Sequence, residues 1–178
     1  MTDTPFICDG TWEYLCCKRP GKKLDLASQQ KDRSWMKETL RICPEKNGVD
    51  EIPIQALIHH PDLGVIAKTS NQCIHHHDPT AHAEILAIRK AGKTLSNYRL
   101  NGCTLYVSLE PCPMCFYALM QARIQRIVFA APDTSLGILS QGVFEHTHAK
   151  LNHHFSWTGG VCSDLASSEL RAFFANRR

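Results

Sequence analysis

The apolar positions of the chain fall into short runs and helical stretches that predict alternating strands and helices. Residues 52–58 are apolar and rich in branched side chains, and residues 65–69 follow them after the turn-forming segment 59–64, which predicts a β-hairpin. Two further runs, 103–108 and 124–130, predict strands in the second half of the chain. Helices are predicted over residues 34–42, 80–91, 113–122 and 163–176.

Local signals indicate where these helices begin and end. Ser34 is expected to cap the first helix, and Pro44 to end or kink it. Asp78-Pro79-Thr80 is a helix-start signature, and Gly92 is expected to stop that helix. The order of helix, hairpin and then alternating helices and strands indicates a mixed sheet covered by helices, which is an α/β layered domain.

Residues 1–33 differ from the rest of the chain. They mix charges with Pro20, Gly21 and other turn formers and show no sustained apolar period. We interpret them as an N-terminal extension of unknown role, loosely structured or packed on the body. A chain of 178 residues suits one domain with a substantial core, so residues 34–178 are expected to form that domain.

Composition narrows the class of protein. Hydrophobic residues make up 43% of the chain, as in ordinary globular proteins. No apolar run approaches the ~20 residues that a membrane span needs, and residues 1–10 lack the basic start and apolar stretch of a signal peptide. We therefore expect a cytoplasmic protein without a membrane partner. Nine cysteines, an odd number, favour reduced thiols or metal ligands over a disulfide framework.

Charge gives a weak signal along the whole chain and a stronger one at its C-terminal end. The net charge of +3 is compatible with a polyanionic partner but does not by itself indicate one. Arg171, Arg177 and Arg178, however, flank Phe173-Phe174, and aromatic rings can stack on bases while arginines pair with phosphates. The alternative is an amphipathic last helix with its aromatic residues in the core, which composition alone favours.

Two short motifs contain the candidate metal ligands, His82-Ala83-Glu84 and Pro111-Cys112-Pro113-Met114-Cys115. In the first turn of a helix, Cys112 and Cys115 lie on one side, and the helix N-terminus favours their thiolates. His82 adds a third ligand if the two helix starts face each other. Structural zinc sites have four protein ligands, whereas catalytic sites keep one position for water, so three ligands beside an acid predict catalytic zinc. Glu84 is then the general acid–base residue.

Two other interpretations of these residues remain open. The Cys-x-x-Cys spacing also occurs in redox dithiols. A structural zinc site would need a fourth ligand, which Cys103 or one residue of His75-His76-His77 could supply. Neither interpretation accounts for Glu84. The three consecutive histidines are themselves expected to be part of a polar loop, because adjacent side chains do not easily converge on one ion.

His-x-Glu followed by Pro-Cys-x-x-Cys is the signature of zinc nucleobase deaminases. Around it the chain resembles the tRNA adenosine deaminases of that family over roughly residues 34–178. The matching segments are His77–Ile85, Asn97–Leu100, Leu105–Val107, Leu109–Cys112, Arg126–Phe129, Asp133, Asn152-His153, Phe173-Phe174 and Arg177-Arg178.

The resemblance implies a three-layer α/β/α cytidine-deaminase-like sandwich with a central mixed five-stranded sheet, assembled as a homodimer. The implied reaction is hydrolytic deamination of adenosine to inosine at the wobble position of a tRNA anticodon. One zinc ion per subunit would be held by His82, Cys112 and Cys115, with Glu84 as the proton shuttle. The implied substrate-binding residues are Asn71, Asp133, Asn152 and Phe174, with Phe173, Arg177 and Arg178 as further candidate RNA contacts.

Three departures from the family pattern bear on the substrate. Gln55 stands where the family commonly has glycine, the 131–137 loop keeps Asp133 but lacks nearby basic residues, and Pro44 interrupts a helix that usually continues. The alternative enzyme is a zinc deaminase of a free nucleobase or nucleoside of the guanine, cytosine or cytidine type. The non-enzyme alternative is a silent zinc-binding partner subunit, against which the retained Glu84 argues.

Overall fold

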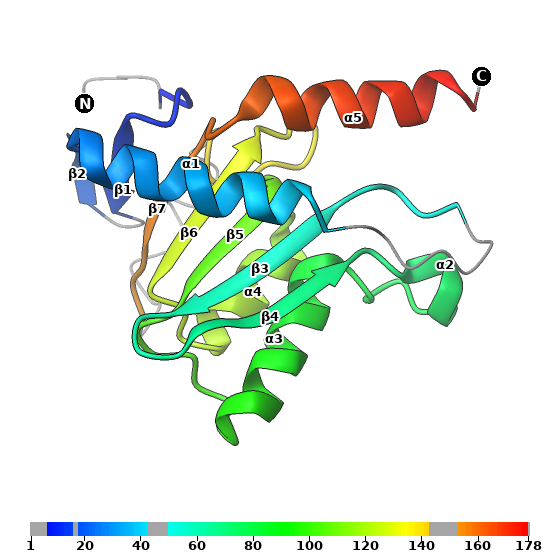
Figure 1. Ribbon diagram of the computed structural model, residues 1–178, viewed down its shortest axis with the longest axis horizontal. Helices are drawn as coiled ribbons and strands as arrows, with labels where there is room; N and C mark the ends of the chain where they lie inside the picture. Colours follow the sequence, from blue (N-terminus) through cyan, green and yellow to red (C-terminus); the bar gives the residue numbers. More distant parts are fainter. Residues whose placement is uncertain (1–6, 16–17, 43–49, 143–152, 178) are drawn as a thin grey trace.

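The strands form one mixed sheet with helices on both faces (Figure 1). The structure is a computed structural model that describes residues 7–15, 18–42, 50–142 and 153–177. Its strands are β1 (Trp12–Leu15), β2 (Lys18–Lys23), β3 (Gln55–His60), β4 (Gly64–Ser70), β5 (Thr104–Leu109), β6 (Arg126–Ala131) and β7 (Ser156–Thr158). Its helices are α1 (Leu26–Leu40), α2 (Cys73–His76), α3 (Ala83–Leu95), α4 (Pro113–Gln121) and α5 (Ser163–Ala175).

Within the described residues the sheet has seven strands, in the order β2-β1-β7-β6-β5-β3-β4, so the expected count of five is wrong. The pairs β5–β6 and β6–β7 are parallel and the other pairs are antiparallel, which confirms a mixed sheet. The two additional strands, β1 and β2, come from the N-terminal segment and extend the sheet beyond β7. The sequence of β2, KRPGKK, has no apolar alternation and therefore did not predict a strand. Charged residues and proline are tolerated there because β2 is an edge strand, which has a pairing partner on one side only.

Helices α1 and α5 cover one face of the sheet, and α3 and α4 cover the other (Figure 1). Side chains alternate along β3, so Ala56 and Ile58 belong to the core under α3 and α4 while Leu57 belongs to the core under α1 and α5. The expected three-layer α/β/α sandwich is confirmed. This arrangement places the N-termini of α3 and α4 together on one face.

The first helix begins earlier than expected. Asp25, rather than Ser34, is its N-cap, and the Asp25 carboxylate accepts a hydrogen bond from the Ser28 backbone N–H at 2.7 Å. The helix ends at Leu40, before Pro44, which lies outside the described residues. Helix α1 therefore crosses the predicted boundary at residue 33, and the division of the chain there stays a prediction.

The expected hairpin is confirmed as β3 and β4, but both ends of the helix predicted over 80–91 are wrong. Helix α3 begins at Ala83 with His82 as its N-cap, since Asp78 and Thr80 form a separate turn closed by a 2.8 Å hydrogen bond from the Thr80 N–H to Asp78 Oδ1. The helix continues through Gly92 to Leu95 and ends at Ser96, which takes the left-handed conformation with φ of 49°.

Candidate metal centre and active site

Two helix N-termini bring the predicted metal ligands together. His82 is the N-cap of α3, Cys112 is the N-cap of α4, and Cys115 lies in the first turn of α4. Proline at the first position of α4 preorganises that helix start, because its fixed φ suits the first turn and it lacks the N–H that would be unpaired there. The spacing argument for the three side chains therefore agrees with the observed geometry.

The distances between the three ligand atoms match a zinc shell. His82 Nδ1 lies 3.7 Å from Cys112 Sγ and 3.5 Å from Cys115 Sγ, and all three atoms lie within 4.8 Å of one another. Zinc bound tetrahedrally at its usual distances separates a nitrogen from a sulfur ligand by roughly 3.6 Å. The donor set therefore fits zinc without rearrangement.

Among the described residues, this trio is the one group of three or more potential ligands close enough for a single ion. Cys103 is fully buried in the core, and His75 and His76 lie in the short helix α2. The alternative of a structural site completed by Cys103 or a histidine of residues 75–77 is thus not supported by the geometry. A three-ligand site leaves a coordination position for water or substrate.

The two thiols differ in protonation. A hydrogen bond from Cys115, outweighing the effect of burial, lowers the pKa of Cys112 to about 5. The same hydrogen bond, together with burial and the nearby Glu84, raises the pKa of Cys115. The lowered pKa of Cys112 favours its thiolate, which is the form that binds a metal cation.

Glu84 lies beside the ligands in the first turn of α3 and is 4% exposed. Burial, and to a smaller extent Cys112, raise the pKa of Glu84 to about 7 against the opposing effects of a backbone hydrogen bond, His82 and Cys115. A carboxyl group with a pKa near the working pH can both accept and release a proton, as a general acid–base residue must.

Asn71 directly follows β4 and is 6% exposed. Its backbone N–H donates to the Ile54 carbonyl at 2.9 Å, and the N–H of the following residue, Gln72, donates to the Ala81 carbonyl at 3.0 Å. The Thr69 hydroxyl donates to the Ala83 carbonyl at 2.7 Å. The chain around the end of β4 is therefore hydrogen-bonded to the residue before His82 and to the residue after it. The Asn71 side chain donates to Glu51 Oε2 at 3.2 Å.

Asp133 is half-buried in the loop after β6, where its carboxylate is already occupied. Its Oδ1 accepts from the Ser135 and Leu136 N–H groups at 2.8 and 3.1 Å. Glu110, 2% exposed and just before the cysteine motif, holds this loop by accepting from the N–H groups of Asp133, Leu139 and Ser140 at 3.0, 2.8 and 2.8 Å. The loop is thereby anchored to the strand that ends at the metal ligands.

The aromatic residues at the end of α5 are not in the core, so that alternative is wrong for the described chain. Phe173 is half-buried and Phe174 is 49% exposed. The Arg177 guanidinium lies 4.1 Å from the centre of the Phe173 ring and pairs with Asp50 Oδ2 at 2.6 Å. Asn152 and Arg178 lie outside the described residues.

Gln55, the departure from the usual glycine, is fully buried on the α5 side of the sheet. Its Nε2 donates to Glu169 Oε1 of α5 at 3.3 Å, and its Oε1 has no hydrogen-bond partner among the residues that the structure describes. Leu57, two residues along the strand, faces the same core. The substitution therefore changes the packing of α5 on the sheet, on the face opposite α3 and α4.

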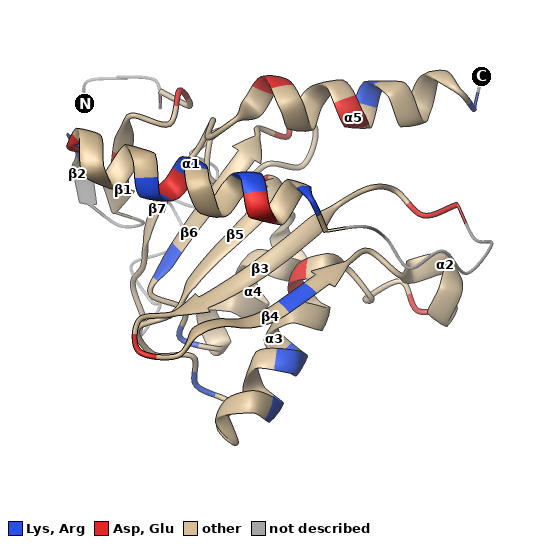
Figure 2. Ribbon diagram, viewed as in Figure 1, with Lys and Arg blue, Asp and Glu red and all other residues tan. Residues whose placement is uncertain are grey.

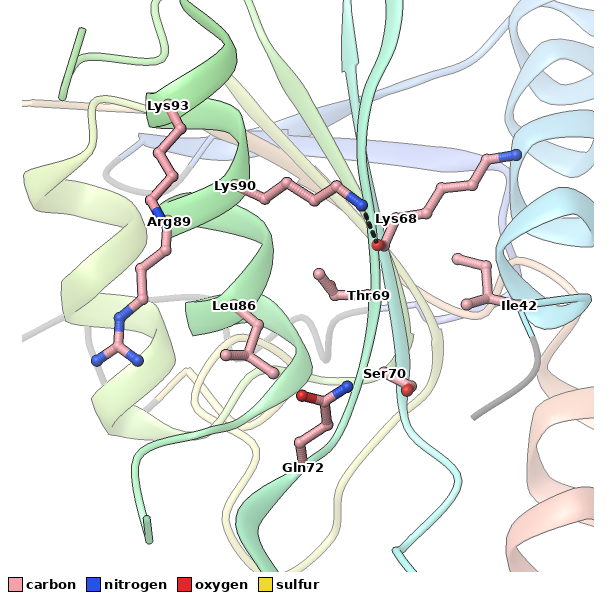
Figure 3. A pocket seen from close by; sticks show the side chains of 9 residues that line it. All are labelled: Ile42, Lys68, Thr69, Ser70, Gln72, Leu86, Arg89, Lys90 and Lys93. Carbon is pink, nitrogen blue, oxygen red and sulfur yellow. Dashed lines mark hydrogen bonds between the residues drawn. The ribbon is translucent and has the colours of Figure 1, made fainter. Parts of the chain in front are cut away.

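A groove of about 400 Å³ lies between α3 and the edge strand β4 (Figure 3). Its basic lining residues are Lys68, Arg89, Lys90 and Lys93, and blue segments mark this part of α3 and β4 in Figure 2. The charged ends of these side chains do not point to one place, however. Lys68 pairs with Glu38 at 2.7 Å, whereas Arg89 pairs with Asp78 at 3.8 Å. Lys90 Nζ donates to the Lys68 carbonyl at 3.3 Å. The groove thus has a basic rim without a convergent anion site.

Sequence reasoning missed Glu51 and Glu110. Each is an acid next to an apolar strand, and their partners lie 20 or more positions away in the chain. Only the position of Glu110 directly before Pro111 could have drawn attention to it.

Comparisons with known proteins agree with this site. Residues 29–131 match the family model of the cytidine and deoxycytidylate deaminase zinc-binding region. The tRNA-specific adenosine deaminase of Haemophilus influenzae is 38% identical over 147 residues, which cover 83% of this chain and 85% of the relative.

Two solved structures share the fold. One, from a study of A-to-I editing by tRNA:A34 deaminases at the wobble position of transfer RNA, has a TM-score of 0.69 and 34% identity, covering 76% of this chain and 99% of its own. The other, a guanine deaminase from Nitrosomonas europaea, has a TM-score of 0.66 and 26% identity, covering 80% and 84%. With the clustered histidine and cysteines, these matches show that the chain belongs to the zinc-binding cytidine and deoxycytidylate deaminase family.

Proposed function

We propose that this protein hydrolyses adenosine to inosine at the wobble position of tRNA anticodons, releasing ammonia. The observation that carries the proposal is the convergence of His82, Cys112 and Cys115 beside the buried Glu84. That site supports zinc-dependent hydrolytic deamination. The similarity to tRNA-specific adenosine deaminases over most of both chains supports this substrate.

The chain's own residues account for the proton transfers. His82, Cys112 and Cys115 would hold one zinc ion per subunit, and the chemistry that zinc supplies at such a site is an acidified water that serves as nucleophile. Glu84 accepts a proton as the nucleophile adds to C6 of adenine. It delivers that proton to the ring, then takes a second proton from the hydroxyl group added at C6 and passes it to the amine, which leaves as ammonia. Its pKa of about 7 permits both directions of transfer near neutral pH.

Recognition of the RNA is proposed for the residues that the family resemblance implies. Asn71 would hydrogen-bond the target base, and Asp133, Asn152 and Phe174 would contact the anticodon loop, with Phe173, Arg177 and Arg178 as further contacts. The 49% exposure of Phe174 leaves its ring accessible for stacking on a base. An anticodon base is already single-stranded, so extruding it costs less than flipping a paired base.

The assembly and location of the protein follow from the same proposal. We infer a homodimer in the cytoplasm, where tRNA is the partner. Within the described chain, no helix is both long and apolar enough to cross a membrane. Residues 34–178 are proposed as the deaminase domain, with residues 1–33 contributing strands to its sheet.

The competing function is deamination of a free base, which is supported by the similarity to a guanine deaminase. The relative named a tRNA-specific adenosine deaminase has the greater identity to this chain, 38% against 26%. The exposed Phe174 and Arg177 could contact an RNA loop, whereas binding of a free base does not require them. A silent zinc-binding subunit is disfavoured because Glu84 is present and buried with a raised pKa.

The direct test is incubation of the zinc-loaded protein with total tRNA, followed by sequencing for new inosines. Inosine confined to wobble positions is expected. Glu84→Gln should retain zinc and the melting temperature but produce no inosine, whereas Glu38→Gln, which changes a half-buried acid of α1 on the other face of the sheet, should behave as wild type. Activity on free guanine or cytidine without tRNA inosine would select the competing function.

A further inference from the structure

The Glu51 carboxylate joins two segments of the chain that meet at Asn71. Its Oε1 accepts hydrogen bonds from the backbone N–H groups of Ile74 and His75 at 2.6 and 2.9 Å. Its Oε2 accepts from Asn71 Nδ2 at 3.2 Å. Glu51 stands on the segment leading into β3, so these bonds link that segment to the loop after β4.

The hydrogen bonds from Ile74 and His75 to Glu51 stabilise the start of helix α2. Helix α2 has four residues, and its N-cap Gln72 makes no capping bond with its side chain. The first N–H groups of a helix have no partner within the helix. Glu51 supplies that partner from a distant segment, and a carboxylate near a helix N-terminus is electrostatically favourable.

The other link determines how the Asn71 amide is turned. An ionised carboxylate only accepts hydrogen bonds, so the NH₂ group of Asn71 must face Glu51 and its carbonyl oxygen must point elsewhere. Asn71 Oδ1 lies 3.6 Å from the Cys73 thiol, a weak donor. The amide therefore presents one remaining N–H and an Oδ1 lone pair in a defined orientation.

The neighbouring residue Asp50 is held as well. Arg177 pairs with its carboxylate at 2.6 Å and donates to its backbone carbonyl. The end of α5 thus anchors the chain directly before Glu51, and Asn71 is bonded through its backbone to Ile54 on the same segment.

We propose that Glu51 is a positioning residue for substrate recognition, which orients the Asn71 amide toward the base while it also holds the start of α2. This rests on the proposed function, in which Asn71 contacts the base. Glu51 itself does not touch the substrate. A purine presents fixed donors and acceptors on its edge, so an amide turned the wrong way replaces an attraction with a repulsion.

Two substitutions separate the two links. Glu51→Gln keeps an oxygen that can accept from Ile74 and His75, but it places an NH₂ group against Asn71 and so favours the flipped amide. It should lower kcat/KM on an anticodon stem-loop by about 10- to 100-fold, the scale of losses from misplacing a group at an active site. Glu51→Ala should cause at least that loss. Glu38→Gln is the matched control and should leave kcat/KM unchanged.

Amide hydrogen exchange, zinc content and melting temperature provide measurements that do not depend on activity. Glu51→Gln should retain the protection of the Ile74 and His75 amides, and Glu51→Ala should lose it, with zinc bound in both. Lost zinc or global unfolding in Glu51→Gln would overturn the proposal, because the residue would then maintain the fold rather than orient an amide.

The decisive comparison is made in an Asn71→Ala background. If Glu51 acts through Asn71, Glu51→Gln should change kcat/KM there by less than about twofold. An equal fold-loss in both backgrounds, or full activity of Glu51→Gln, would refute the positioning role while wild-type inosine formation still stands. Absence of inosine with the wild-type protein would instead refute the proposed function.

Discussion

Replacing Asp32 with alanine should destabilise the protein by about 3–5 kcal/mol, because it removes the main partner of a buried cation. Asp32 on α1 accepts two hydrogen bonds from the Arg126 guanidinium, at 2.7 and 2.8 Å. The side chains of Asp32 and Arg126 are 2% and 17% exposed, so water cannot readily replace the lost carboxylate. The same substitution tests whether the N-terminal residues are part of the domain core.

The expected size follows from the partners that remain. Glu13 accepts from Arg126 Nε at 3.1 Å and Thr158 Oγ1 accepts from Nη2 at 2.8 Å, so the cation keeps some compensation. The buried Tyr106 hydroxyl, which donates to Asp32 at 3.1 Å, also loses its acceptor. That loss accounts for about 1–3 kcal/mol of the expected destabilisation. For a chain of this size the loss corresponds to a melting temperature lower by roughly 10 °C.

Urea unfolding of the zinc-loaded protein, followed by circular dichroism, measures the effect. Asp62→Ala, in the exposed turn between β3 and β4, is the control and should change the free energy of unfolding by less than about 0.5 kcal/mol. Adding Arg126→Met to Asp32→Ala should recover much of the loss, since an apolar side chain needs no counterion. A loss below about 1 kcal/mol for Asp32→Ala would refute the reasoning.

Three further outcomes are expected. In the metal-free protein, the wild type should lose roughly 3 kcal/mol of stability relative to Glu84→Gln as the pH rises from 4.5 through about 7, because burial raises the folded-state pKa of Glu84; urea titrations of both proteins measure this difference, since the opposing titration of Cys112 is present in both. Gly137→Ala should cost about 1–3 kcal/mol in thermal unfolding, because the added Cβ would overlap the Glu110 carboxylate. Arg177→Lys should weaken tRNA binding in filter assays nearly as much as Arg177→Ala, since lysine cannot reproduce the paired contacts with Asp50; wild-type affinity would show that charge alone matters.

Local sequence signals predicted the elements whose partners are near in the chain. Strands β3, β4, β5 and β6 and the helix over 113–122 appear close to where apolar runs placed them, whereas β7 was not predicted. Cap signals were less reliable, because Asp78-Pro79-Thr80 closes a turn and the helix starts only at Ala83. A turn and a helix start use the same residue types to satisfy free N–H groups, so composition does not separate them.

The N-terminal strands were not predictable in the same way. Residues 12–23 have no apolar period, and β1 becomes a strand because it pairs with β7, more than a hundred positions along the chain. Hydrogen bonds between backbone groups so far apart in the chain leave little trace in the local pattern of side chains near the end of a sheet. Arg126, Asp32 and Glu13 likewise appear as unrelated charges until the fold brings them together.

The sequence alone determined the chemistry of this protein, because the identities and short spacings of His82, Glu84, Cys112 and Cys115 specify a metal donor set with an acid beside it. Tertiary structure decided which acids support that chemistry. Glu51 and Glu110 act on backbone groups and on Asn71 across long stretches of chain, and such contacts depend on how helices and loops pack rather than on any local pattern. The raised pKa of Glu84 likewise arises from burial, which exists only in the folded protein.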